Sequence, residues 1–384
     1  VNSIAFYPAL IALAFVLSSY LLIQFDFSET GKSIKSNTRW LSLKDATTAR
    51  SIISTIVSGI ISLTVFSFSI VMIILNQTAS QMSNRILDEL IGNRFQQVVL
   101  GIYIGTIMFG LFLLSTIRDI DSGIYIPSIS TYFLILVTIV DIFLFIYFLH
   151  FITQSVKYEV IIHRIYRQTM VAMKNCSSKN GAWEAPIGLL PQNGYVVKAS
   201  TCGIYEGFNK EALLQICERE QCSMNVLFTR GSFVYEDSPV LQLSHPIPAQ
   251  AVKDARESLY FNDRETISNN YFYGFRQLTE VALRALSPGI NDPGTAVQSL
   301  RALAKLFMFR LANNPNEVTR SKSADIIIIT KEHDLNEMFV TSILPIWDYG
   351  KNDRSIQWEL LALCEKLLSV ENIKSASLLH AHVL

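Results

Sequence analysis

Four long apolar stretches in the first half of the chain constrain its fold more than any other feature. They lie at about residues 4–25, 51–76, 98–117 and 129–152 of the 384-residue sequence. A helix needs about 20 largely apolar residues to cross a bilayer, and each stretch reaches about that length. Residues 1–156 are therefore predicted to form a transmembrane domain of about four α-helices, with the lipid bilayer as the first expected partner.

The orientation of these spans is less constrained. The first stretch has no basic segment before it and no small-residue cleavage site, so it predicts an anchor and not a removable signal. Basic residues are nearly balanced between the two sides of the membrane. The cysteines form an odd, scattered set after the apolar half, which favours reduced thiols and a cytosolic C-terminal region; they are Cys176, Cys202, Cys217, Cys222 and Cys364.

The second span carries small polar residues along one helical stripe, while its other faces are Ile, Leu, Val and Phe. The candidates for lining a pore are Ser51, Ser54, Thr55, Ser58, Ser62 and Ser69, followed by Asn76 and Gln77. In lipid such a stripe must face protein or water. Two interpretations stay open: close packing of helices through small residues, or a water-filled axis surrounded by several copies. The amphipathic pattern continues past the span and predicts a rod reaching Gly92.

The fourth span contains two intramembrane polar candidates, Asp141 near its middle and His150 toward its end. A carboxylate inside the bilayer is costly and marks a functional or partnered site. The alternative is a neutral Asp141 hydrogen-bonded to Ser or Thr of a neighbouring helix, and His150 is interpreted as a boundary residue. In the third span, Gly101 and Gly105 are four residues apart and predict a close helix contact.

The second half of the chain predicts a soluble α+β region. We expect a helix and linker over 157–190, a small α/β or barrel-like module over 191–246, and a mainly helical domain over 247–384. Residues 231–243 predict two short strands around a turn, similar to the hairpins of small barrel-sandwich domains such as lipoyl modules. The turn holds Glu236-Asp237-Ser238 and no lysine, so no lipoyl or biotin attachment is predicted.

A proline-rich elbow interrupts the helical pattern at residues 284–296, RALSPGINDPGTA. Two prolines forbid helix continuation, and Asp292 before Pro293 predicts a helix N-cap with proline in the first helical position. The elbow is either a corner between two helices or a site for anions or partners, because exposed loops with open N–H groups can bind them. Its candidate residues are Arg284, Ser287, Asn291 and Asp292.

The SPGINDP run, the preceding GFRQLTEVALRAL and the multi-span N-terminal half resemble a bacterial family of predicted membrane proteins, domain of unknown function 2254. The resemblance covers essentially the whole chain and implies a bacterial cytoplasmic (inner) membrane, with no activity attached to it. In that family the region before the corner helix is similar to Arg-Thr-x-x-Gln-Asp. Here it reads RETISNN, with Asn270 in place of the acidic residue, which weakens any catalytic role for this region.

The sequence contains few signs of catalysis. Its formal net charge is zero and only 17% of its residues are charged, which argues against a nucleic-acid partner. P-loop, dinucleotide, HExxH and nucleophile-elbow motifs are missing, so we predict no enzyme, no catalytic residue, no cofactor and no metal site. Two functions are expected: a homo-oligomeric ion channel or transport-type pore with a cytosolic gating or assembly domain, or a membrane-anchored sensor or scaffold. Either one would take an ion, a small-molecule ligand or a partner.

Overall fold

The structure is a computed structural model that describes residues 6–38, 43, 45–81, 94–117, 126–177, 194–313, 315, 318–320 and 327–369. The chain divides into two compact units, Val1–Lys157 and Tyr158–Leu384, here called unit 1 and unit 2. The two units are described separately.

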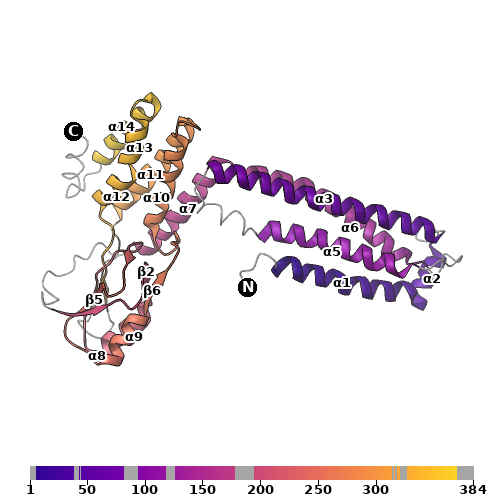
Figure 1. Ribbon diagram of the computed structural model, residues 1–384, viewed down its shortest axis with the longest axis horizontal. Helices are drawn as coiled ribbons and strands as arrows, with labels where there is room; N and C mark the ends of the chain where they lie inside the picture. The colour runs from indigo at the N-terminus through magenta and orange to yellow at the C-terminus, as the bar shows by residue number, and fades with distance from the viewer. Residues whose placement is uncertain are drawn as a thin grey trace. The chain divides into compact units, whose positions relative to one another are not determined.

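Unit 1 is a bundle of long helices that run side by side (Figure 1). Its helices are α1 (Phe6–Phe27), α2 (Glu29–Asn37), α3 (Ala46–Gln81), α5 (Arg94–Thr116) and α6 (Ser128–Ser155). Within the described residues, four of them, all except α2, are long and apolar enough to cross a membrane. The four predicted spans are therefore confirmed.

Helix α5 packs against α1, α3 and α6, and it is the most buried of the four long helices. Its two spaced glycines allow the closest approach to α1. A Cβ atom on Gly101 would lie 2.9 Å from Ile11 Cδ1 and 3.0 Å from Pro8 Cα, and one on Gly105 would lie 2.7 Å from the Phe15 ring. The small-residue contact predicted for the third span is thus confirmed as packing against α1.

Unit 2 contains two small sheets. Its strands are β1 (Tyr195–Lys198), β2 (Gly203–Phe208), β3 (Met224–Val226), β4 (Phe233–Val234), β5 (Pro239–Leu243), β6 (Leu259–Asn262), β7 (Val318–Arg320) and β8 (Ile327–Ile329). The five-stranded sheet has the order β1-β5-β3-β8-β7, and the three-stranded sheet has the order β4-β2-β6. Only β3 and β8 pair in parallel; the other described pairs are antiparallel.

The predicted barrel-like module is not confirmed. The two strands expected to form its hairpin, β4 and β5, belong to different sheets, and the described strands close no barrel. Asp237 in the turn between them has a left-handed backbone (φ 62°). Val234 and Leu241 are buried in the same apolar cluster, so the two sheets share one core and each strand pairs with a different neighbour.

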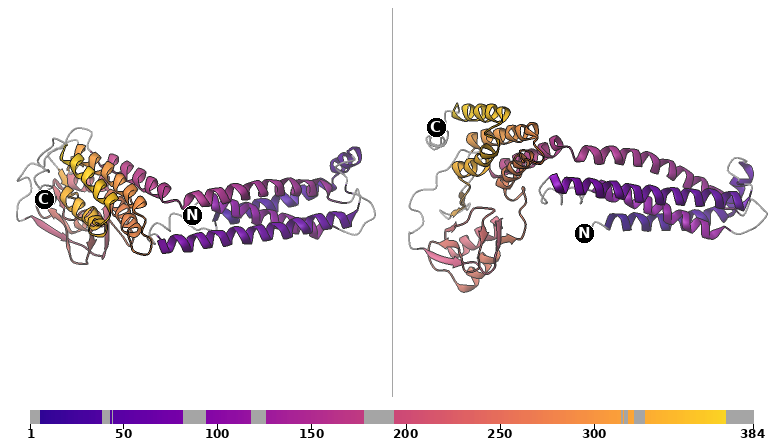
Figure 2. Two further views of the ribbon diagram at one scale, coloured as in Figure 1. Left: turned by 90° about the horizontal axis from the view of Figure 1, so that it is seen from above. Right: turned by 45° about the horizontal axis from the view of Figure 1, so that its top comes forward.

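The helices of unit 2 form two groups. Helices α8 (Lys210–Glu220) and α9 (Ala249–Glu257) lie with the sheets. The second group consists of α7 (Tyr158–Cys176), α10 (Tyr271–Ala285), α11 (Pro293–Ala312), α12 (Leu335–Ser342), α13 (Leu344–Gly350) and α14 (Arg354–Leu368). Within unit 2, the helices of this group pack against one another (Figures 1 and 2).

Helix α10 is the core of this helical group. Of its 15 residues, 11 are buried, so the helix is enclosed on most sides and not only on the apolar face with Phe275, Leu278 and Val281 that the sequence predicted. The ring of Phe275 on α10 lies 5.0 Å from that of Phe307 on α11, which in turn lies 6.0 Å from Phe339 on α12. A Cβ atom on Gly274 would lie 1.8 Å from Thr169 Oγ1, so glycine is required for the close contact of α10 with α7.

Candidate functional site

The hydroxyl stripe of α3 lies on the outside of unit 1. Its members are all exposed: Ser51, Ser54, Thr55, Ser58, Ser62, Ser69 and Asn76. The opposite face of the helix, including Ile53, Val57 and Ile60, is buried in the bundle. A Cβ atom added to Gly59, which borders the stripe, would meet no atom within 4 Å. The stripe therefore does not pack against the other described helices of unit 1. Gln77 lies on α3, but its side chain is outside the described part.

Three hydroxyls of the stripe bond to their own helix. Thr55 Oγ1 donates to the carbonyl oxygen of Ser51 (2.8 Å), and Ser62 Oγ donates to that of Ser58 (3.0 Å). Ser69 Oγ donates to the carbonyl oxygen of Val65 (2.8 Å). These three hydroxyl protons are used within the helix, and the remaining lone pairs of each of these oxygens can accept from outside it. The stripe offers small side chains and neutral acceptors, which suit water or the backbone of another helix.

Helix α3 is longer than its apolar segment. Its 36 residues span about 54 Å at 1.5 Å per residue, whereas the membrane-spanning segment ends at Ile74. The predicted continuation of the helix past Asn76 is confirmed as far as Gln81; residues 82–93 lie outside the described part. The stripe thus follows a helix that is long enough to cross the whole bilayer.

Asp141 is fully buried in the bundle, whereas His150 is exposed on α6. The hydroxyl of Thr106 on α5 lies beside the Asp141 carboxyl. Tyr103, also on α5, and Ser67, on α3, complete a group of buried polar side chains from three helices. The structure thus places the two intramembrane candidates apart, and sequence reasoning missed the three residues around Asp141 because they come from other helices.

The proline corner forms as predicted. Helix α10 ends at Ala285, and Asp292 is the N-cap of α11: its carboxylate accepts from Thr295 N (3.1 Å) and from Thr295 Oγ1 (2.6 Å), with Pro293 in the first turn. The N–H of Asp292 also donates to the carbonyl oxygen of Ala285 (2.8 Å), which closes the corner. Asn291 has a left-handed backbone (φ 49°), a conformation that asparagine tolerates better than most residues.

The corner packs against the start of α7. The pKa of the Tyr158 phenol is raised, by burial first and then by the carboxylate of Asp292, and the guanidinium of Arg284 offsets part of this rise. These three groups therefore lie close together. Ser287 Oγ donates to the carbonyl oxygen of Arg284 (2.6 Å), and Asn291 is exposed. Because a carboxylate already occupies the N-terminus of α11, a bound anion would be repelled there. The geometry favours a structural corner over an anion site.

Sequence reasoning missed an ion pair buried at one end of the bundle. Lys35 Nζ on α2 lies 3.0 Å from Asp26 Oδ1 on α1, and both side chains are at most 1% exposed. Asp26 Oδ2 also accepts from the backbone N–H and the hydroxyl of Ser130 in the first turn of α6, both at 2.8 Å. Lys35 donates to the carbonyl oxygen of Ile126 (3.1 Å).

The RETISNN segment is a scaffold for the start of α10. Glu206 on β2 is 4% exposed and accepts from Thr266 N (2.9 Å) and Asn269 Nδ2 (3.0 Å). Glu265 pairs with Arg276 of α10 and accepts from Asn270 Nδ2 (3.1 Å). Asn270 replaces the acidic residue of the related pattern and caps α10, with its side-chain oxygen accepting from Phe272 N (3.1 Å). Both carboxylates thus accept from residues of this segment, and Glu265 also joins it to α10.

The cysteines of unit 2 are free thiols. Burial raises the pKa of the Cys217 thiol to about 12, and burial raises that of Cys176 in spite of the nearby guanidinium of Arg230. Because the thiolate is the reactive form, neither residue is activated as a nucleophile. Within the described residues, no group of three His, Cys, Asp or Glu side chains could hold a metal ion.

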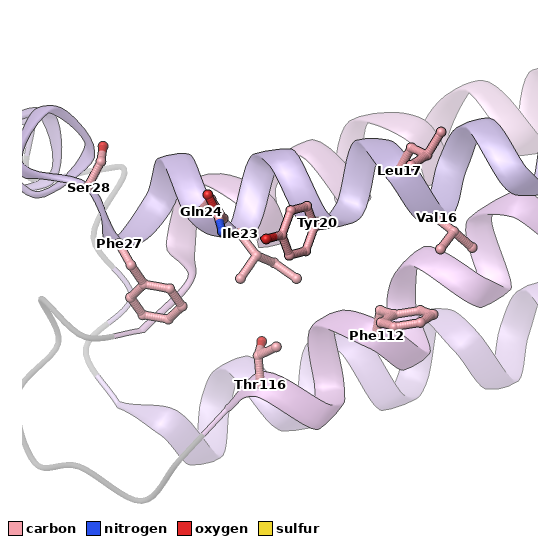
Figure 3. A pocket seen from close by; sticks show the side chains of 9 residues that line it. All are labelled: Val16, Leu17, Tyr20, Ile23, Gln24, Phe27, Ser28, Phe112 and Thr116. Carbon is pink, nitrogen blue, oxygen red and sulfur yellow. Dashed lines mark hydrogen bonds between the residues drawn. The ribbon is translucent and has the colours of Figure 1, made fainter.

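A groove of about 730 Å³ lies between α1 and α5 (Figure 3). Apolar side chains dominate its lining, among them Val16, Ile23 and Phe112. The polar contact inside it is between Gln24 Nε2 and the hydroxyl of Tyr20 (2.7 Å). The groove lies on two of the helices that are long and apolar enough to cross a membrane, and its lining includes no charged side chain.

Comparison with known proteins agrees with this architecture. The family model described as predicted membrane protein (DUF2254) matches residues 1–366. An uncharacterised protein of Mycobacterium bovis is 21% identical over 326 residues, and one of Mycobacterium tuberculosis (strain CDC 1551) is 23% identical over 339 residues. Each alignment covers 82% of this chain but only 63% of the relative, so the chain spans less than two thirds of their length. No solved structure matches the chain.

Proposed function

We propose that several copies of this chain, which belongs to the DUF2254 family of predicted membrane proteins, assemble around an axis lined by α3. The assembly would form an ion channel or transport-type pore. The observation that carries this proposal is the outward orientation of the hydroxyl stripe. A polar stripe on the outside of a membrane bundle needs water or another polar surface next to it. Assembly around an axis supplies both.

The shape and charge of the stripe support a pore. Its side chains are small, and the space beside Gly59 is open, so neighbouring copies of α3 can stand close to a common axis. Oxygen acceptors without charge can replace part of the hydration shell of an ion without trapping it. The other exposed side chains of unit 1 are mainly large and apolar, such as Leu21, Phe143 and Ile146, as expected of surfaces that face lipid.

Unit 2 is then the gating or assembly domain. Its first helix, α7, begins three residues after α6 ends. Because this connection is short, a displacement of α7 would also displace the end of α6, the last span. We place unit 2 in the cytosol and the bundle in the bacterial inner membrane, because the five thiols are free and reduced thiols are typical of the cytosol.

The test uses single cysteines in a chain whose native cysteines are replaced. Cysteines at Ser58, Ser62 and Ser69 should react with small water-soluble thiol reagents in proteoliposomes, because only hydrated thiols form thiolates. Two controls should stay unreactive: Ile60→Cys, at a position buried in the bundle, and Phe143→Cys, at a position 68% exposed on α6, on the surface expected to face lipid.

A second measurement separates a pore from close packing. Ser62→Trp in a pore should keep the oligomer size of the wild type and abolish release of K⁺ from loaded proteoliposomes. If α3 instead packs tightly on another copy, the added volume should dissociate the oligomer. Dissociation of Ser62→Trp together with unreactive Ser58→Cys and Ser62→Cys variants would reject the pore and leave a membrane-anchored sensor or scaffold.

A further inference from the structure

A carboxyl group in the middle of unit 1 has no charged partner. Asp141 has no exposed surface, and within the described residues neither of its oxygens has a hydrogen bond of normal geometry. The position lies near the centre of a span of 28 residues. An isolated carboxylate in such a medium costs so much free energy that the group becomes neutral instead.

The groups around Asp141 are hydroxyls from two other helices. Thr106, Tyr103 and Ser67 are at most 4% exposed, and the hydroxyls of Tyr103 and Ser67 have no hydrogen-bond partner within the described residues. The phenol of Tyr103 is a titratable group close to Asp141, and none of the described ion pairs includes Asp141. A single carboxyl group among hydroxyls suits one positive charge, whereas divalent ions take six to eight oxygen ligands with several carboxylates.

The hydrogen bond of Thr106 decides which positive charge this is. Thr106 Oγ1 donates its proton to the carbonyl oxygen of Ile102 (3.0 Å), so its lone pairs can only accept from Asp141. A bond between the two side chains therefore forms when the Asp141 carboxyl supplies the hydrogen. We propose that Asp141 is a proton-binding site within the membrane unit, held as a neutral acid that donates to Thr106.

Asp26 in the same bundle shows the opposite design. It is equally buried, but Lys35 and two donors of Ser130 surround its carboxylate. The protein thus supplies a cation and donors to one buried aspartate and neither to the other. The proton site is also separate from the proposed pore, because Ser67 lies on the buried face of α3 and the hydroxyl stripe lies on the exposed face.

Infrared spectroscopy of the full chain in lipid nanodiscs at pH 7 tests this proposal. Asp141→Asn is nearly isosteric with the neutral acid and should fold like the wild type by circular dichroism. The spectrum of Asp141→Asn should lack a protonated-carboxyl C=O band that the wild type shows and that shifts in D₂O. Asp45→Asn is the control. Asp45 is exposed and accepts from Thr48 N (2.5 Å) and Thr47 Oγ1 (2.6 Å), so this variant should lose only a carboxylate band.

Two variants at Thr106 test the hydrogen bond and leave Asp141 in place. Thr106→Val removes the acceptor at nearly constant volume, so the acid band should move to higher frequency. Thr106→Ser keeps the acceptor, and the band should stay. The proposal is overturned if the wild type shows no acid band, if Asp141→Asn loses a carboxylate band instead, or if Thr106→Val leaves the acid band unmoved.

Discussion

The buried pair of Asp26 and Lys35 provides the sharpest test of how unit 1 is held together. Lys35→Met keeps most of the side-chain volume and removes the ammonium group that lies 3.0 Å from Asp26 Oδ1. The Asp26 carboxylate then stays inside the bundle with the two donors of Ser130 as its partners. We expect the first turn of α6 to lose much of its protection, because Asp26 joins that turn to α1.

The size of the effect follows from burial. Removing one partner of a buried ion pair costs about 3–5 kcal/mol, because the other charge is left uncompensated. The Ser130 donors, each at 2.8 Å, retain part of the stabilisation, so the lower end, about 3 kcal/mol, applies here. Since 1.4 kcal/mol corresponds to a factor of ten, local opening should become roughly 10²-fold more frequent.

Hydrogen exchange followed by mass spectrometry measures this opening in peptides that contain Ser130. Lys32→Met is the matched control, because Lys32 lies on the same helix and pairs with Glu29, whose side chain is 94% exposed; the loss of this pair should cost at most about 1 kcal/mol. Asp26→Asn with Lys35→Met removes both charges and should restore most of the protection. Equal exchange rates in Lys35→Met and Lys32→Met would refute the argument.

The remaining predictions concern unit 2. Asn291→Leu should lower the free energy of unfolding by about 1–2 kcal/mol, because the left-handed backbone at this position (φ 49°) disfavours a branched side chain. Asn291→Gly is the control, and equal melting temperatures for the two variants would contradict this account of the corner. The exposed Cys202 tests on which side of the membrane unit 2 lies, whereas the buried Cys222 would react with no reagent on either side. A membrane-impermeant thiol reagent should therefore label Cys202 only after the cells are broken; labelling in intact cells would place unit 2 outside.

The sequence alone determined the features that depend on a few consecutive residues. Each span is recognisable because about 20 consecutive apolar residues form a helix that can cross the hydrocarbon core, whichever helices lie next to it. The corner is recognisable because Pro293, Asp292 and Asn291 impose a helix stop, a cap and a turn through their own backbones and side chains. Its N-cap was predicted to the residue, and the structure has Asp292 in that position.

Tertiary structure decided the contacts between distant segments. Asp26 and Ser130 are 104 residues apart in the sequence, and the paired strands β3 and β8 are separated by a similar number of residues. The predicted hairpin did not form: β4 pairs with β2, and β5 pairs with β1 and β3, although residues of both strands belong to one apolar cluster. No local pattern encodes such choices, since they depend on which apolar faces meet when the whole chain packs.

The two faces of α3 show the same division. The sequence placed the hydroxyls on one stripe, because helical spacing alone fixes which residues share a face. It did not reveal that this stripe points away from the bundle, or that Ser67 on the other face lies with Tyr103 and Asp141. The orientation of a helix is set by the free energy of burying one face against its neighbours, and here the apolar face with Ile53, Val57 and Ile60 was the one buried.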